Sequence, residues 1–173
     1  LVNLEGFGLA ATQSEQAPAR MGQWLDEVKK QRAGDNDLKP YPDAAGVAAR
    51  LMKTNRRLGQ GQADWLAQHW AQVGPDGQWR ILGDAAHKVV NPYLFQVNEA
   101  LAMYRNIRAP VLAVEASDDS LSQWWKGKYT LAEFHERLKA VAVLEKAVID
   151  DAGHMLHHDQ PQQLAALIEK FTA

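Results

Sequence analysis

Three short apolar runs, separated by long polar stretches, predict three buried β-strands. They span residues 1–4, 111–114 and 147–149. Each run ends in a glycine-containing or polar segment of the kind that terminates strands. The second and third runs lack strict alternation of polar and apolar positions, which favours parallel strands covered on both faces. The chain is therefore predicted to be an α/β protein with a small parallel sheet.

The stretch between the second and third predicted strands has the period of an amphipathic helix. Thr130 is its predicted N-cap, and Glu133 is the capping-box partner three residues later. The apolar positions that follow at helical spacing are Leu131, Phe134, Leu138 and Val141. This pattern predicts a right-handed strand–helix–strand unit. A closing helix is predicted after Asp159, with one apolar face formed by Leu164, Leu167, Ile168 and Phe171.

The long middle of the chain, residues 12–106, contains no convincing strand. Helical patterns cover residues 19–32, 43–58, 62–72 and 92–104, and glycine- and proline-rich breakers separate them. A helical block inserted between strands of an α/β unit is typical of a cap over a site. The predicted organisation is thus a core strand and turn at 1–11, a helical cap or lid at 12–106, and the C-terminal part of the core at 107–173.

Composition narrows the functional classes. Nineteen basic and 21 acidic residues give a net charge of −2, without a basic stripe, so neither nucleic acid nor a membrane surface is an expected partner. The chain has no cysteine, which excludes disulfides, thiolate catalysis and cysteine metal sites. A reducing compartment fits this composition, and a cytoplasmic location is predicted. No apolar run approaches the roughly 20 residues of a membrane span.

Three parallel strands with one crossover helix do not cover both faces of a sheet and also close a core. An edge strand left without a neighbour would be an aggregation hazard. Because the chain also begins abruptly on an apolar run at Leu1, we expect an N-terminal part of the same protein to complete the sheet. The oligomeric state is left open.

His154 is the strongest candidate for a catalytic side chain. It follows the third predicted strand in a polar loop, directly after Gly153, whose backbone freedom can aim a neighbouring side chain. A strand, a histidine loop and a helix in this order match the logic of a nucleophile–histidine–acid triad. His154 is therefore predicted to be a general base, rather than a loop histidine without a role.

Three carboxylates compete for the role of the acid that orients His154. Asp118 and Asp119 follow the second strand, upstream of the histidine, in the order that a triad acid requires; Asp119 is preferred. Either aspartate could instead simply cap the following segment. Glu5 ends the first strand and is the rival, because the end of a neighbouring strand could reach the same histidine.

The remaining histidines and the tryptophans are interpreted as packing or helix-capping residues rather than as catalytic ones. His154, His157 and His158 have a spacing that can resemble metal ligands, but no separate carboxylate except Asp159 accompanies them, so no metal site and no cofactor are predicted. His157 and His158 are expected to cap and solvate the first turn of the last helix. Trp124 and Trp125 are interpreted as packing residues, although tryptophans of a cap can line a pocket.

Several segments carry a resemblance to a known family. Residues 109–119 (APVLAVEASDD) resemble the strand of α/β-hydrolases that leads to the triad acid, although Ala116 stands where the family usually has glycine. Residues 152–161 (AGHMLHHDQP) are similar to the histidine loop and last helix of that family. Residues 1–8 resemble the strand that enters the cap, and the cap most resembles the serine-hydrolase-like branch. The resemblance therefore implies the last three parallel strands of an α/β-hydrolase fold with a helical cap.

The resemblance implies a capped esterase-like hydrolase with a small-molecule substrate and a Ser-His-acid triad. The 173 residues contain no Gly-x-Ser-x-Gly elbow, so the nucleophile is expected in the N-terminal part and this chain alone is expected to be inactive. Two alternatives stay open. One is a relative with an aspartate nucleophile, of the dehalogenase or epoxide hydrolase type; the other is a non-catalytic binding module that kept the scaffold.

Overall fold

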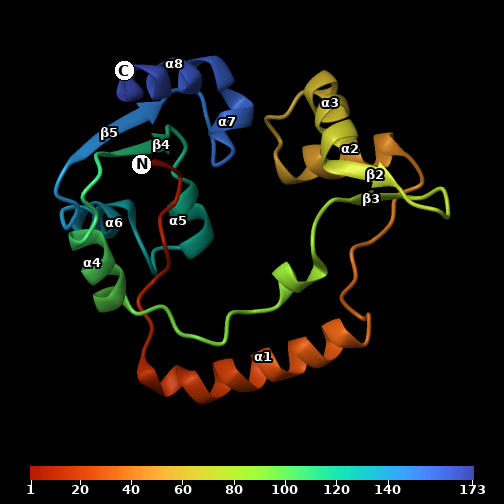
Figure 1. Cartoon of the computed structure of the whole chain (residues 1–173), viewed down its shortest axis with the longest axis horizontal. Helices are drawn as coiled ribbons and strands as arrows, with labels where there is room; N and C mark the ends of the chain where they lie inside the picture. The colour runs from red at the N-terminus through yellow and green to blue at the C-terminus, as the bar shows by residue number, and fades with distance from the viewer. The chain divides into compact units, whose positions relative to one another are not determined.

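The computed structural model describes all 173 residues, and the chain folds into two compact units (Figure 1). Residues 1–12 and 95–173 form the first unit, and residues 13–94 form the second. We call them the sheet unit and the inserted unit. None of the helices in either unit combines the length and the apolar composition of a membrane span.

The sheet unit is built on three parallel strands in the order β1-β4-β5. Strand β1 spans Val2–Leu4, β4 spans Val111–Ala116 and β5 spans Leu144–Ile149. The register pairs β4 with β1 on one side and with β5 along its whole length on the other. The prediction of three parallel strands is confirmed, and their carboxyl ends meet at one edge of the sheet.

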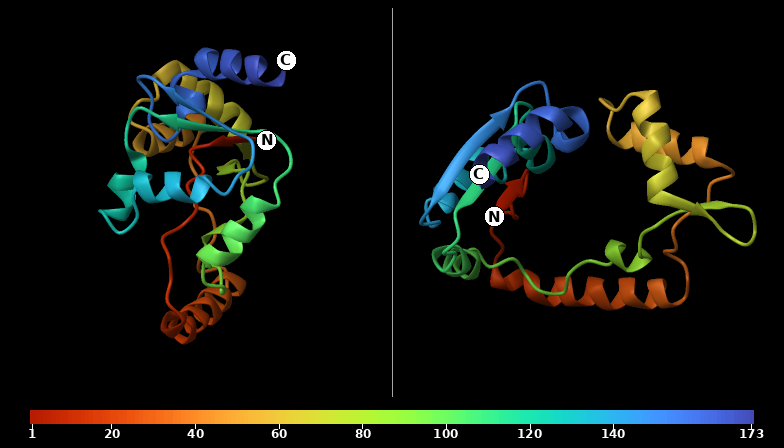
Figure 2. Two further views of the ribbon diagram at one scale, coloured as in Figure 1. Left: turned by 90° about the vertical axis from the view of Figure 1, so that its left-hand side faces the viewer. Right: turned by 45° about the horizontal axis from the view of Figure 1, so that its top comes forward.

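Helices pack on both faces of β4 (Figure 2). Val111 and Ala113 join one buried cluster with residues of α5 (Ser120–Trp125) and α6 (Leu131–Leu138). The alternate β4 positions join a second cluster with α7 (Leu156–Asp159) and α8 (Pro161–Thr172). A strand covered on both faces needs apolar side chains at successive positions, as β4 has. The same expectation is wrong for β5, where Glu145, Lys146 and Val148 are exposed because β5 is an edge strand.

The helix predicted between the second and third strands forms as α6. The Thr130 hydroxyl accepts a hydrogen bond from the Glu133 backbone N–H at 3.2 Å, which confirms the predicted N-cap. The closing helix also forms, as α8. The short helix α7 precedes it and contains His157 and His158.

The inserted unit is mostly helical. It contains the 3₁₀ turns η1 (Ser14–Gln16) and η2 (Ala85–Lys88), and the helices α1 (Ala17–Arg32), α2 (Ala44–Thr54) and α3 (Gln60–Trp70). Its buried core joins α2 to α3 through small and aliphatic side chains: Val47, Ala48, Leu58, Ala63, Leu66, Ala67 and Ala71. Helix α4 (Val97–Arg105) belongs to the sheet unit, so the inserted unit ends at residue 94 rather than at residue 106.

The prediction of no strand between residues 12 and 106 is wrong at one place. Strands β2 (Ala71–Val73) and β3 (Trp79–Ile81) form an antiparallel hairpin. The breaker Gly74-Pro75-Asp76-Gly77 is its turn, with Gly77 in the left-handed region at a φ of 75°. Strands of three residues are too short to show alternation, which is why the periodicity did not reveal them.

Candidate active site at the carboxyl ends of the strands

The end of β1 places Glu5 in an unusual backbone conformation. Its backbone N–H donates to the Val114 carbonyl at 2.9 Å, which extends the pairing with β4, while its φ of 52° is left-handed. The following Gly6 lies so close to Asn3 that an added Cβ would be 2.1 Å from the Asn3 Oδ1. A left-handed non-glycine residue is strained, and such strain is concentrated at functional sites. The turn thus holds the Glu5 side chain in one direction at the edge of the sheet.

The Glu5 carboxylate lies in the interior, with only 4% of the residue exposed. Its Oε1 accepts a hydrogen bond from the Ala116 backbone N–H at 2.6 Å. Burial raises the pKa of Glu5 above its ordinary value, and this effect outweighs the hydrogen bonds from Ala116 and Ser120 and the neighbouring His154, which lower the pKa. Burial therefore favours the neutral form of the Glu5 carboxyl, and the neighbouring donors favour its ionised form.

His154 lies in the loop after β5, and hydrogen bonds to the residue after β4 and to α7 hold this loop. The Ser117 hydroxyl accepts from the Ala152 backbone N–H at 3.2 Å, and the Gly153 N–H donates to Asp159 Oδ2 at 2.8 Å. The left-handed residue in this loop is Asp151, with a φ of 49°, and not Gly153. The expected role of Gly153 as the residue with unusual angles is therefore wrong, although the loop does present His154.

Glu5 and His154 face each other across the strand ends. The distance from His154 Nδ1 to Glu5 Oε2 is 3.5 Å. Both atoms are buried and neither has a hydrogen-bond partner, whereas the His154 side chain as a whole keeps 39% of its surface exposed. The exposed part of the imidazole is thus the part away from Nδ1. A distance of 3.5 Å is long for a hydrogen bond.

Asp119, the preferred acid in the sequence, is engaged elsewhere. It is the N-cap of α5, where its Oδ1 accepts from the Ser122 backbone N–H at 2.9 Å and its Oδ2 accepts from the Ser122 hydroxyl at 2.5 Å. Asp118 contributes its backbone N–H to the Ala152 carbonyl at 3.0 Å. Of the four candidate residues, the structure brings Glu5 and His154 together and uses Asp119 as a helix cap.

The two histidines after His154 are packed against each other. Their ring centroids are 4.2 Å apart, and burial lowers the pKa of both. His158 is buried, so the expectation that it solvates a helix turn is wrong, because α7 turns this side chain inward. No group of three or more histidine, aspartate or glutamate side chains is arranged to hold a metal ion.

The scan against family models finds the alpha/beta hydrolase family over residues 7–167. This chain belongs to the alpha/beta hydrolase family. A search of curated protein sequences gives no match. Solved structures resemble the fold at low sequence identity.

A hypothetical protein from Pseudomonas aeruginosa PAO1 superimposes with a TM-score of 0.73 at 20% identity, over 94% of this chain and 53% of its own. A thioesterase domain from the curacin biosynthetic pathway gives a TM-score of 0.70 at 20% identity, over 92% of this chain and 54% of that domain. An esterase from M. tuberculosis superimposes with a TM-score of 0.64 at 14% identity, over 95% of this chain and 52% of the esterase. This alpha/beta hydrolase chain therefore spans about half the length of the solved structures that it matches.

Sequence reasoning missed two further residues near the site of this hydrolase-family chain. Ser120 and Trp124 are four residues apart and so lie on one face of α5. Ser120 is buried and lies among the groups that lower the pKa of Glu5, and the centroids of the Trp124 and His154 rings are 4.2 Å apart. The interpretation of Trp124 as a packing residue missed this contact, because the spacing has meaning only once the direction of α5 is known.

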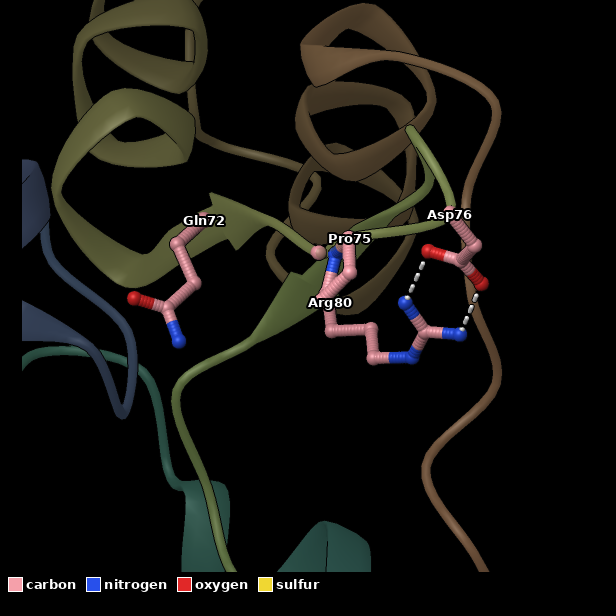
Figure 3. Close-up of a pocket in the computed structure, with 5 residues that line it drawn as sticks. Gln72, Pro75, Asp76 and Arg80 are labelled. Atoms are coloured by element: carbon pink, nitrogen blue, oxygen red, sulfur yellow. Dashed lines mark hydrogen bonds and ion pairs between the residues drawn. The ribbon is translucent and has the colours of Figure 1, made fainter.

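The inserted unit has an open hollow of its own, with a volume of about 430 Å³ (Figure 3). Gln72, Gly74, Pro75, Asp76 and Arg80 line it. Two hydrogen bonds of 2.8 and 2.6 Å join Arg80 to Asp76, and they lower the pKa of Asp76. Because the two charges satisfy each other, this hollow has neither a free acid nor a free base.

Proposed function

We propose that these 173 residues supply the base and the orienting acid of a hydrolase that cleaves an ester or a related acyl bond. His154 is the base and Glu5 is the acid in this proposal. The single observation that carries it is the buried pair of His154 Nδ1 and Glu5 Oε2 at 3.5 Å, at the carboxyl ends of parallel strands. The inserted unit, which enters the chain between β1 and β4, is assigned the role of a cap.

The nucleophile in this proposal is a serine carried by an N-terminal part of the protein outside these residues. The chain covers 53% and 54% of two hydrolase-fold structures, which supports this division. The 173 residues alone are accordingly inactive. The absence of cysteine supports a cytoplasmic location.

The proposed chemistry assigns each atom of the pair a role. His154 Nε2 takes the proton of the serine hydroxyl as the oxygen attacks the acyl carbon, and it then returns this proton to the leaving group. The imidazolium formed in between donates its Nδ1–H to Glu5 Oε2. Glu5 thereby fixes the tautomer of the imidazole and stabilises its charge, without itself taking the proton. A water molecule then releases the acyl group by the same route.

His154→Ala in the full-length protein tests the base. Hydrolysis of p-nitrophenyl acetate should fall by about 10³-fold or more, because removal of a triad member leaves only residual catalysis. The thermal midpoint should change little, since the side chain is 39% exposed. His157→Ala, an exposed histidine in the next turn, is the matched control and should retain activity. Full activity of His154→Ala would contradict the proposal.

A fluorophosphonate reagent identifies the nucleophile. The expected result is one phosphonylated serine, located by mass spectrometry of the full-length protein, and its loss in the presence of substrate. An active protein that resists the reagent and instead forms an ester on an aspartate would favour the dehalogenase or epoxide hydrolase type. A protein with neither adduct nor turnover would favour the binding module.

A further inference from the structure

Trp124 is the largest apolar side chain that is both exposed and in contact with the proposed base. It keeps 54% of its surface exposed, and its ring centroid lies 4.2 Å from that of His154 with the ring planes at 78°. This edge-to-face arrangement is a favourable geometry for aromatic pairs. The next residue, Trp125, behaves differently, because it packs against the hydrophobic core of the sheet unit and lies 6.2 Å from the Tyr129 ring.

The helix α5 explains why these adjacent tryptophans differ. Leu121 and Trp125 share the face that packs into the core, whereas Ser120 and Trp124 share the face toward the Glu5–His154 pair. Asp119 caps this helix and so fixes its direction. The N-cap bond of Asp119 therefore has two effects. It fixes the helix that brings Trp124 against His154, and it occupies the Asp119 carboxylate, which is then not available to His154.

The imidazole and the indole are both partly exposed, and their rings lie side by side. His154 Nδ1 is buried against Glu5, so the reacting acyl group has to approach the opposite side of the ring. With ring centroids 4.2 Å apart, a group bound there meets the indole as well. An indole presents a wide apolar face, and covering it with an apolar group removes that area from water.

We propose that Trp124 is a specificity-determining residue that contacts the acyl group of the substrate and favours apolar or aromatic acyl groups over acetyl. This inference rests on the proposed function, because it takes His154 as the base. The occupant of the Trp124 surface is thus the acyl chain of the substrate, rather than a packing partner in the protein.

The test compares two esters in the full-length protein, p-nitrophenyl phenylacetate and p-nitrophenyl acetate. Trp124→Ala should lower kcat/KM for phenylacetate by roughly 10-fold more than for acetate, because the apolar contact is lost only for the larger acyl group. Trp124→Phe should retain most of the preference, since it keeps an aromatic face. Trp125→Phe is the matched control on the same helix and should leave the ratio unchanged.

Two results would overturn the inference. One is an equal loss for both esters in Trp124→Ala together with a lower thermal midpoint, which would mean that Trp124 packs against another part of the protein. The other is an unchanged ratio of the two kcat/KM values. Either result could occur while His154→Ala is inactive, so the proposed function would stand.

An independent readout does not need turnover. In protein labelled with 5-fluorotryptophan, the fluorine resonance that disappears in Trp124→Phe belongs to Trp124. This resonance should shift on addition of phenylacetate and in His154→Gln. If the proposed function fails because His154→Ala stays active, the shift with phenylacetate still tests the contact, and its absence would refute it.

Discussion

The ends of β1 and β4 each carry an acidic residue, and the two carboxylates have opposite surroundings. Glu5, at the end of β1, is buried, strained in its backbone and opposed to His154 at 3.5 Å. Asp119, three residues beyond β4, is exposed and caps α5. In sequence order Asp119 fits the triad better, but its carboxylate is occupied by Ser122. The comparison teaches that a carboxylate is free to face a histidine only when its oxygens are not already bound elsewhere. The order of residues in the chain does not reveal this.

The largest expected difference between the two carboxylates is in activity. In the full-length protein, Glu5→Gln should lower kcat for p-nitrophenyl acetate by about 10³-fold or more, because a neutral amide stabilises no imidazolium and permits the wrong tautomer. Asp119→Asn should stay within a few-fold of the wild type. Steady-state kinetics measure both. If Asp119→Asn were the more damaging substitution, Asp119 would be the acid and the assignment of Glu5 would be abandoned.

The same Glu5→Gln substitution should stabilise the fold at neutral pH. Burial raises the pKa of Glu5, so the folded protein favours the protonated form, and folding stability falls as the pH rises from the ordinary carboxyl range through the raised pKa. A neutral amide at this position lacks this loss, because burying an ionised side chain costs more than burying a neutral one, and a gain of about 1–3 kcal/mol is expected. Denaturant unfolding at two pH values measures it; the gain should vanish below the ordinary carboxyl range. A gain independent of pH would exclude ionisation as its cause.

Removing the cap should affect stability rather than chemistry. Asp119→Ala leaves the first turn of α5 without its side-chain acceptor and should cost about 0.5–2 kcal/mol, as measured by urea unfolding. Asp119→Ser keeps an acceptor and serves as the control. Equal stability of the alanine and serine variants would show that the cap contributes nothing.

The smallest expected effect concerns the turn that directs Glu5. Gly6→Ala places a Cβ against Asn3 Oδ1 and should break the hydrogen bond from Asn3 Nδ2 to the Gly6 carbonyl, at a cost of about 0.5–1.5 kcal/mol. Asn3→Ala removes the bond without the added Cβ and is the control. Urea unfolding measures both costs. If Gly6→Ala were no less stable than Asn3→Ala, this turn would not depend on the space at Gly6.

The pattern of apolar residues predicted most of the sheet unit because its determinants are local. The three runs and the cap at Thr130 are short-range signals, and each forms where expected. Prediction failed where a feature depends on residues far away in the chain, or where an element is too short to show a periodic pattern. The exposure of β5 depends on its place at the edge of the sheet, and the β2–β3 hairpin has strands of only three residues. The predicted cap extends to residue 106, whereas the inserted unit ends at residue 94, because α4 belongs to the sheet unit.

The sequence by itself determined the class of the chain, the parallel strands and the candidate base, because these follow from local periodicity and from the residues around His154. Only the tertiary structure decided which carboxylate faces His154 and which tryptophan lies beside it. Glu5 and His154 are far apart in the chain, and the register of β1 and β5 on the two sides of β4 places their ends together. Pairing across a sheet is a non-local property, and no spacing in a single sequence encodes it.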